Sequence, residues 1–199
     1  MKLILASGSP RRLELLRQLG LSPSIQPADI DESVDSNESP DAYVERLARE
    51  KCTTVVRSID VATDPDSVVI GADTTVAVDG EILGKPTNRA DAIAMLDKLS
   101  DRTHEVLTGV AVGRGDLLVS AVETTLVTFG PINGHDAAWY VDSGEPMDKA
   151  GAYAIQGAGG LFVRSINGSA DNVVGLPRHL TALLFEQVGL RLTDARMVE

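Results

Sequence analysis

Two adjacent arginines, Arg11 and Arg12, follow the small-residue stretch Ala-Ser-Gly-Ser-Pro at residues 6–10. We expect a short apolar strand at residues 2–6, and a proline suits the first position of the following helix, where no amide hydrogen bond is needed. Free backbone N–H groups and the positive end of the helix dipole then meet two guanidinium groups. This pattern predicts a phosphate site formed by Ser7, Gly8, Ser9, Arg11 and Arg12. The alternative is a serine-capped surface helix with two solvated arginines.

An acidic residue, Asp73, comes directly after the apolar run at residues 68–70 and the dipeptide Gly-Ala. We therefore expect Asp73 at the end of a buried strand, which is where α/β proteins place ligands. A carboxylate at such a place can bind Mg²⁺ or activate a water molecule. The alternative is an aspartate that only closes its own turn by hydrogen bonding.

Two lysines and one glycine-rich stretch are further candidates. Lys85 lies between Gly84 and Pro86, where the backbone has little freedom and the side chain can point at a fixed anion. Lys51 lies in a charge-rich helix, and these residues alone favour a solvated helix face for it over a role in anion binding. Residues 143–157 combine acids, Lys149 and Gln156 with glycines and alanines, which let a backbone approach a ligand closely. Gln156 offers both a donor and an acceptor for the edge of a base, although the stretch also fits a flexible surface loop.

These residues need a scaffold of mixed α and β elements. The hydrophobic spacing predicts strands at about 2–6, 68–70, 74–78, 81–83, 104–112, 117–129 and 161–166. It predicts helices at about 10–19, 40–57, 89–99, 134–142 and 176–188. Hairpins are expected at Asp79-Gly80 and at 113–116. This order indicates a mixed sheet covered by helices and not a purely parallel doubly wound fold.

Composition excludes several function classes. The chain has 18 basic and 29 acidic side chains, a net charge of −11, which argues against binding to nucleic acid or to an anionic membrane surface. An aromatic content of 4% leaves no series of platforms for base stacking. Surplus carboxylates suit a protein that handles small anions together with divalent cations.

The length of 199 residues is typical of one domain, and we expect a single domain over 1–199 with a loose tail at about 193–199. The single cysteine, Cys52, permits no disulfide within the chain and indicates a reducing, cytoplasmic compartment. We expect Cys52 to be a small apolar filler in a helix. No apolar run approaches the length of a membrane span.

Several segments together resemble the Maf family of nucleoside triphosphate pyrophosphatases. The resemblance covers residues 3–185 and rests on motifs in a fixed order, of which no single one would suffice. The motifs are LASGSPRRLELL at 5–16, RLAREK at 46–51, GADT at 71–74, GKP at 84–86, RTHEV at 102–106, the stretch 143–157, INGS at 166–169 and NVVGLP at 172–177.

The resemblance implies a fold, an activity and a set of partners. The implied fold is α/β, with an elongated mixed sheet flanked by helices and a cleft between two lobes, similar to inosine triphosphate pyrophosphatases. The implied activity is metal-dependent hydrolysis of a nucleoside triphosphate to the monophosphate and pyrophosphate, with a role in clearing non-standard nucleotides. The DKAGAYxIQG form of the 148–157 loop is similar to the branch that prefers dTTP and UTP. Members of the family are commonly homodimers.

The resemblance also implies residue roles. Asp73 is the proton acceptor, and together with Glu32 or Asp31 it holds Mg²⁺ or Mn²⁺. Arg11 and the amides of residues 7–9 hold the triphosphate, whereas Arg12 either assists or braces the loop. The remaining phosphate oxygens are assigned to Lys51, Lys85 and Lys149, and selection of the base to Thr74 and Gln156.

Two other function classes use the same phosphate site. One is a nucleotide-binding regulator of cell division that does not turn nucleotides over. The other is a phosphomonoesterase or a kinase-like transferase. The product released from dTTP or UTP in the presence of Mg²⁺ distinguishes these alternatives.

Overall fold

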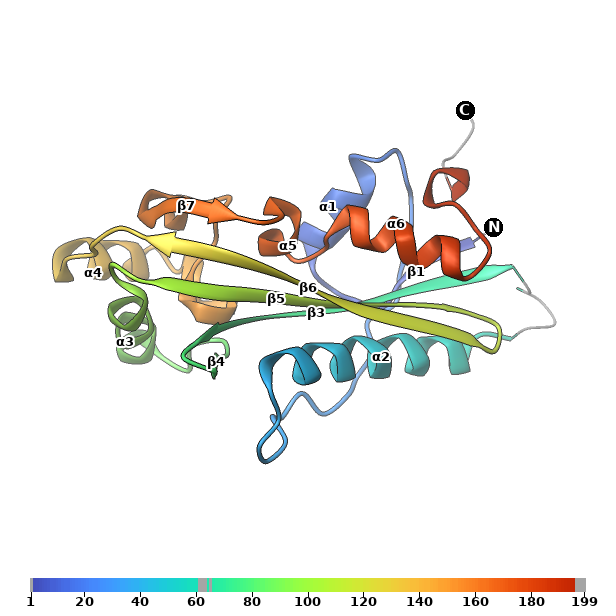
Figure 1. The fold of residues 1–199 in the computed structure, drawn as a ribbon, viewed down its shortest axis with the longest axis horizontal. Helices are drawn as coiled ribbons and strands as arrows, with labels where there is room; N and C mark the ends of the chain where they lie inside the picture. The colour runs from blue at the N-terminus through green and yellow to red at the C-terminus, as the bar shows by residue number, and fades with distance from the viewer. Residues whose placement is uncertain (1, 61–63, 65, 196–199) are drawn as a thin grey trace. The chain divides into compact units, whose positions relative to one another are not determined.

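The computed structural model describes residues 2–60, 64 and 66–195 (Figure 1). The strands are β1 Lys2–Leu5, β2 Ser24–Ile25, β3 Ser67–Val78, β4 Glu81–Leu83, β5 Thr103–Arg114, β6 Leu117–Phe129 and β7 Val163–Asn167. The α-helices are α1 Pro10–Arg17, α2 Pro40–Ser58, α3 Arg89–Leu99, α4 Gly134–Asp142, α5 Ala170–Val174 and α6 Arg178–Gln187. Short 3-10 helices are η1 Glu145–Asp148, η2 Ala150–Ala152, η3 Ala158–Phe162 and η4 Leu192–Ala195.

The strands of the described chain form one seven-stranded sheet in the order β2-β1-β3-β5-β6-β7, with β4 paired to β3. Strand β1 runs parallel to both β2 and β3, whereas β4 is antiparallel to β3 and β7 is antiparallel to β6. The predicted mixed sheet with flanking helices is therefore confirmed. The hairpin turns expected at Asp79-Gly80 and at 113–116 connect β3 to β4 and β5 to β6.

The chain forms two compact units. The first unit comprises Met1–Asp73, Thr108–Glu123 and Gly175–Glu199, and the second comprises Thr74–Leu107 and Thr124–Val174. Strands β3, β5 and β6 each contribute residues to both units. The prediction that 1–199 functions as a single domain stays a prediction.

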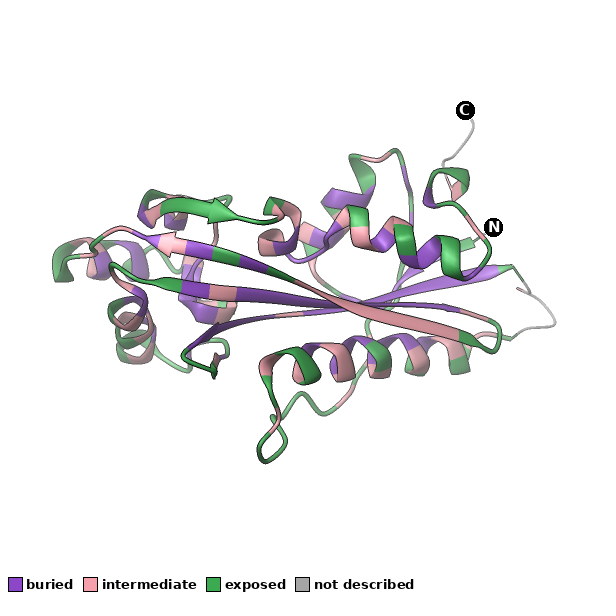
Figure 2. Ribbon diagram, viewed as in Figure 1, coloured by how far each residue is buried: buried purple, intermediate pink, exposed green. Residues whose placement is uncertain are grey.

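In the first unit, α2 lies on one face of the strands, and α1 and α6 lie on the other (Figure 1). The core under α2 is built from small and β-branched side chains, among them Ala48, Cys52, Val69 and Ala111. Cys52 is fully buried, which confirms its expected role as a filler, and burial raises the pKa of its thiol to about 12. Figure 2 shows α2 buried along the side that faces the strands and exposed along the other.

Two glycines allow α2 to lie unusually close to the strands. A Cβ atom at Gly71 of β3 would overlap the carbonyl oxygen of Ala48, and one at Gly109 of β5 would overlap the carbonyl oxygen of Val44. Glycine is therefore required at both places by the approach of the helix backbone. The sequence prediction used Gly71 as the end of a strand, and this was wrong. Strand β3 continues through residue 71 to Val78 because Gly71 makes room for a helix and does not form a turn.

The second unit contains α3, α4, the 3-10 helices η1, η2 and η3, β7 and the nearby parts of the long strands. Its core is aromatic, with Phe129, Tyr140, Tyr153 and Phe162 buried among aliphatic side chains. Phe129 packs edge-to-face against Tyr153 at a centroid distance of 4.8 Å, and Tyr140 does so against Phe162 at 5.3 Å.

The sequence did not predict strand β2 and helix α5, because each is very short and lies in a polar stretch. Residues Leu192–Ala195 form η4, in which Leu192 is buried, and residues 196–199 lie outside the described part, so the loose tail expected at about 193–199 stays a prediction. Within the described residues, every helix is too short or too polar to cross a bilayer.

Candidate functional site

A lysine and two carboxylates form the centre of the candidate site in the first unit. The ammonium Nζ of Lys51 lies 2.6 Å from Oδ1 of Asp73 and 2.5 Å from Oε1 of Glu32. The side chains of Lys51 and Asp73 are only 10% and 13% exposed, whereas Glu32 is 46% exposed. The predicted solvated face for Lys51 is therefore wrong. Burying charges is costly unless they are paired, so these three groups stabilise one another.

Helix and strand periodicity explain why Lys51 and Asp73 meet. Lys51 belongs to the buried face of α2, together with Ala48, Cys52 and Val55. Alternate residues of a strand point to the same side, so Asp73 shares with Gly71 the side of β3 that faces α2. Asp73 thus lies inside a continuous strand, six residues after the first residue of β3, Ser67, and not at the strand end as the sequence predicted.

The loop that contains Glu32 is held by two residues of α2. The hydroxyl of Tyr43 donates to the carbonyl oxygen of Glu32 at 2.9 Å, and Nη2 of Arg46 donates to that of Ser33, also at 2.9 Å. Arg46 also forms a two-point ion pair with Glu38 farther along the same loop, with both distances 2.7 Å. These bonds fix the loop backbone at Glu32 and directly after it.

The resemblance left Glu32 and Asp31 as alternatives, and their contacts differ. Oδ1 of Asp31 accepts a hydrogen bond from the backbone N–H of Ser33 at 2.9 Å, and this bond is the main reason why the pKa of Asp31 is lowered. Glu32 instead reaches Lys51. The structure therefore brings Glu32, and not Asp31, to the lysine–aspartate pair.

Arg12 is buried and connects distant parts of the first unit. Its Nε donates to the carbonyl oxygen of Gly175 at 2.7 Å, and its Nη1 donates to the hydroxyl of Ser7 at 2.9 Å. The same Ser7 hydroxyl accepts from the backbone N–H of Ser9 at 3.2 Å. Of the two roles left open for Arg12, these bonds match the bracing of the loop. The solvated-arginine alternative is wrong for this residue.

Electrostatics link Arg12 to the carboxylates. Burial lowers the pKa of the Arg12 guanidinium, the charge of Asp73 raises it, and the charges of Arg11 and Glu32 have smaller opposite effects. Arg11 and Asp73 therefore both lie within electrostatic range of one buried guanidinium, as the phosphate-site prediction requires. Ser9 begins α1, but its hydroxyl forms no capping hydrogen bond, so the capped-helix alternative lacks its defining contact.

The donor set around Lys51 is suited to a divalent cation only in combination with a ligand. Asp73 and Glu32 offer two carboxylates beside one another, and Mg²⁺ is commonly bound by one or two carboxylates plus phosphate oxygens of a substrate. Across the described residues, no group of three or more His, Cys, Asp or Glu side chains could hold a metal ion without a substrate. The two carboxylates thus fit the cation that the resemblance implies when a phosphate supplies the remaining oxygens.

Comparison with known proteins identifies the family. The family model described as Maf-like protein matches residues 2–188. This chain belongs to the Maf family. It is 50% identical over 188 residues to the dTTP/UTP pyrophosphatase of Symbiobacterium thermophilum, a match that covers 94% of each chain. It is 47% identical over 191 residues to the dTTP/UTP pyrophosphatase of Neisseria meningitidis serogroup B, covering 95% of each chain. The solved Ham1 protein of Staphylococcus aureus aligns with 65% of this chain and 72% of its own at 13% identity and a TM-score of 0.40.

The other predicted site residues of this Maf-family chain lie in the second unit. Thr74 follows Asp73 on β3 and is half-buried, whereas Lys85 is exposed between β4 and α3. Nζ of Lys149 donates to the carboxylate of Asp148 and, at 3.3 Å, to the carbonyl oxygen of Glu145. Gln156 is exposed in a turn between η2 and η3. Their part in substrate binding stays a prediction.

Tyr43 was missed by the sequence prediction. Burial, followed by the charges of Asp73 and Glu32, raises the pKa of its phenol to about 12, so the group stays protonated and can donate to the Glu32 loop. The signal was its spacing: Tyr43 precedes Lys51 by two helical turns, which places both on one side of α2.

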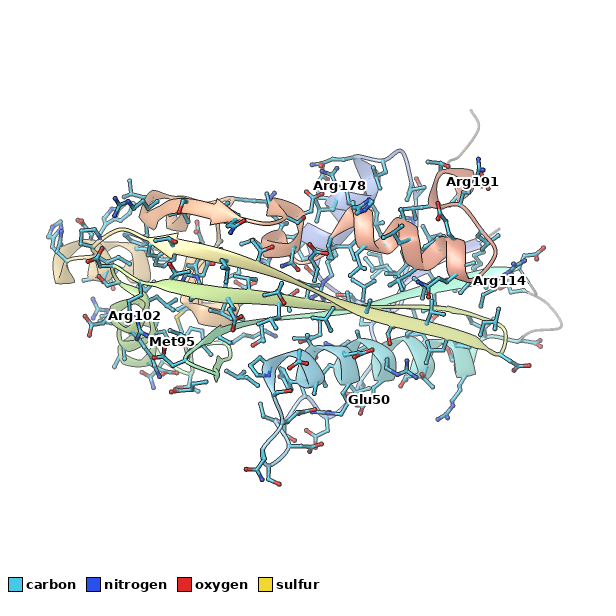
Figure 3. The ribbon with its side chains drawn as sticks, viewed as in Figure 1. Glu50, Met95, Arg102, Arg114, Arg178 and Arg191 are labelled. Atoms are coloured by element: carbon cyan, nitrogen blue, oxygen red, sulfur yellow. The ribbon has the colours of Figure 1, made fainter. Side chains whose placement is uncertain are left out.

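The ion pair between Arg102 and Asp79 is different. In the second unit Arg102, labelled in Figure 3, donates to Asp79 at 2.6 Å, but these side chains are 41% and 72% exposed. Exposed pairs of this kind contribute little to stability because water screens them. The pair formed by Lys51 and Asp73 therefore differs from the Arg102–Asp79 pair in its burial, although both are ion pairs.

Proposed function

We propose that this protein hydrolyses nucleoside triphosphates, with dTTP and UTP preferred, to the nucleoside monophosphate and pyrophosphate. The observation that supports this most strongly is the burial of Lys51 between the carboxylates of Asp73 and Glu32. Charge at a low-exposure position is characteristic of functional sites. The two Maf relatives described above are named dTTP/UTP pyrophosphatases, which supports the choice of substrate.

Asp73 is the proposed proton acceptor. Its carboxylate orients the attacking water and takes a proton from it as the water oxygen bonds to phosphorus. The anhydride bond between the α- and β-phosphates breaks in the same displacement, and pyrophosphate leaves. Lys51 lies against the same carboxylate, so its positive charge is available to a phosphate oxygen that enters beside Asp73. Arg11 and the amides of Ser7, Gly8 and Ser9 hold the triphosphate, and the buried Arg12 keeps that loop in place through Gly175 and Ser7.

Asp73 and Glu32 would hold a divalent cation, Mg²⁺ or Mn²⁺, when the triphosphate is present. Such a cation neutralises phosphate charge and polarises the phosphorus–oxygen bonds of the substrate. Lys51 would then give up part of its contact with these carboxylates to the incoming phosphate oxygens. The loop contacts of Tyr43 and Arg46 keep Glu32 within reach during this exchange.

We assign the second-unit residues to the rest of the substrate. Lys85 and Lys149 neutralise phosphate oxygens, and Thr74 and Gln156 select the base. An amide such as that of Gln156 can donate to one atom of a pyrimidine edge and accept from another. The proposal also includes a homodimer, which the family resemblance implies, and a cytoplasmic location, which the single cysteine favours.

Product identification tests the proposal. The protein is incubated with UTP and Mg²⁺, and pyrophosphate, orthophosphate and UMP are quantified. We expect UMP and pyrophosphate in equal amounts, with dTTP giving the same pattern. Orthophosphate as the first product would indicate a phosphatase. Tight UTP binding without any product would indicate a regulator, and either result would contradict the proposal.

A further inference from the structure

Glu145 in η1 binds the loop that contains Gln156. Its Oε1 accepts from the hydroxyl of Tyr140 at 2.8 Å and from the backbone N–H of Gly159 at 3.1 Å, and its Oε2 accepts from the N–H of Ala158 at 3.0 Å. The Tyr140 hydroxyl in turn accepts from the N–H of Ala154 at 3.0 Å. One carboxylate and one hydroxyl thus satisfy three backbone donors of a single loop.

These bonds are placed on both sides of the turn at residues 155–157. Ala154 is held before the turn by Tyr140, and Ala158 and Gly159 are held after it by Glu145. Gln156 and Gly157 of this turn are exposed, in a segment whose two ends are fixed. The arrangement limits the positions that the Gln156 amide can take.

Two glycines make room for these side chains. A Cβ at Gly157 would overlap the carboxylate of Glu145, and a Cβ at Gly159 would lie 2.6 Å from the hydroxyl oxygen of Tyr140. The glycines of this stretch are therefore explained by the close approach of Glu145 and Tyr140. The flexible-loop alternative for 143–157 does not describe a segment held in this way.

We propose that Glu145 and Tyr140 are positioning residues that set nucleobase selectivity by fixing the Gln156 turn. This inference rests on the proposed function, in which Gln156 contacts the base. Neither residue contacts the reacting atoms in this account. Tyr140 is completely buried and packs against Phe162. The hydroxyl that accepts the hydrogen bond from the N–H of Ala154 is therefore itself held in place.

The chemistry of the site requires a carboxylate and not an amide. Both oxygens of Glu145 act only as acceptors here, and each faces a backbone N–H donor. In Glu145→Gln one oxygen is replaced by an NH₂ group, so a donor faces a donor at one end. Burial alone would raise the pKa of Glu145, but the hydrogen bonds from Tyr140, Ala158 and Gly159 lower it, so the acceptor form is retained.

The test compares selectivity, which a merely structural role would leave unchanged. The ratio of kcat/KM for UTP to that for CTP is measured in the wild type and in Glu145→Gln. We expect the ratio to fall about tenfold, since loss of positioning can cost up to about a hundredfold. Asp142→Asn is the matched control, because it removes one negative charge nearby from an exposed ion pair with Arg89. That control keeps the wild-type ratio.

Two more variants keep the test decisive. Tyr140→Phe removes only the hydroxyl and keeps the buried ring, and we expect it to lower the ratio in the same direction. In a Gln156→Ala background, Glu145→Gln is expected to change the ratio less than about twofold, because coupled residues do not act additively.

The outcomes separate the two proposals. If Glu145→Gln and Tyr140→Phe lower kcat/KM equally for UTP and CTP, or lower only the melting temperature, the positioning role is overturned. The same conclusion follows if Glu145→Gln still changes the ratio about tenfold in the Gln156→Ala background, because the effect would not pass through Gln156. Failure of the wild type to release pyrophosphate from UTP would overturn the proposed function instead, and calorimetric UTP and CTP affinities of the same variants would then decide the positioning role.

Discussion

The two units bury polar groups in opposite ways. In the first unit Lys51 and Asp73 remain as oppositely charged groups at low exposure. In the second unit His104 is 2% exposed, packs edge-to-face on Phe129 at 4.8 Å and shares a 2.9 Å hydrogen bond with the hydroxyl of Tyr153. Burial lowers the pKa of His104 to about 4, so it is neutral near pH 7.

We propose from this difference that the chemistry takes place at the first cluster. A neutral buried pair such as His104 and Tyr153 is part of the packing, and nothing in its surroundings favours a charged ligand. A buried lysine between two carboxylates is a charged group whose contacts can be exchanged. A phosphate can replace the carboxylates as the partner of Lys51, and a cation can replace Lys51 at the carboxylates. We therefore expect substitutions in the first cluster to change turnover and substitutions in the second to change stability.

Of the substitutions that test this comparison, Lys51→Met is expected to have the largest effect on turnover. It removes the charge that faces the phosphate and leaves Asp73 and Glu32 in mutual repulsion, so kcat/KM for UTP should fall about a thousandfold. The measurement is pyrophosphate release under steady-state conditions. Lys98→Met is the control, because Lys98 forms an exposed ion pair with Glu81 in the second unit. If the two variants retain similar activity, burial of the lysine has no functional meaning.

Arg12→Lys should have the next largest effect. Lysine keeps the charge but cannot donate to both Gly175 and Ser7 in the directions that guanidinium does. We expect kcat/KM to fall about a hundredfold and the free energy of unfolding to fall by about 2 kcal/mol. Urea unfolding and UTP turnover measure the two quantities. Arg17→Lys, at an exposed position of the same helix, should match the wild type, and an unaltered Arg12→Lys protein would contradict the bracing role.

Glu32→Gln should have a smaller effect that depends on the cation. The side chain is 46% exposed and shares its proposed role with Asp73, so we expect kcat to fall about tenfold with a higher Mg²⁺ concentration needed for half-maximal rate. Rates are measured over a series of Mg²⁺ concentrations. Asp29→Asn, exposed in the same loop, is the control. An unchanged Mg²⁺ dependence in Glu32→Gln would remove Glu32 from the cation site.

His104→Phe should leave turnover nearly unchanged and alter the pH dependence of stability. The pKa of His104 is lowered from 6.5 to about 4 on folding, so the unfolded chain binds more protons between these values. The free energy of unfolding of the wild type should therefore decrease by about 3 kcal/mol more than that of the variant as the pH falls from 6.5 to 4.

The measurement for His104 is urea unfolding of both proteins over this pH range. His179→Gln is the control, since His179 is exposed on α6. Identical pH dependence in the wild type and in His104→Phe would show that His104 is not held neutral by burial.

Much of the scaffold could be predicted from local patterns. Helices α3 and α4 and strand β6 have the predicted bounds, because Asn88 and Asn133 cap their helices and each element has a regular hydrophobic pattern. The start of β7 and the end of α1 were placed two residues away from where the structure has them. Gly71 misled the prediction because a glycine that admits a neighbouring helix has the same local sequence signal as a glycine that forms a turn.

The contacts of the candidate site could not be predicted from local patterns, because they join residues that are far apart in the sequence. Asp73 is 22 residues from Lys51, and their contact requires α2 to lie against β3, which no local pattern specifies. The partner of Arg12, Gly175, is 163 residues away and contributes only a backbone carbonyl. The family resemblance named Asp73 with Glu32 or Asp31, and the structure brings Asp73 and Glu32 to Lys51. The contacts of Tyr43 and Arg46 depend on the way in which the 32–38 loop folds back on α2.

The most direct test of the account measures UTP binding and UTP turnover on the same preparation of Asp73→Asn. We expect pyrophosphate release to fall at least about a thousandfold, with a calorimetric affinity for UTP within about tenfold of the wild type and with the fold intact at the assay temperature. Asp79→Asn, in the exposed β3–β4 turn, controls for the loss of one charge. Turnover of Asp73→Asn close to that of the wild type would contradict the assignment of this cluster as the catalytic centre.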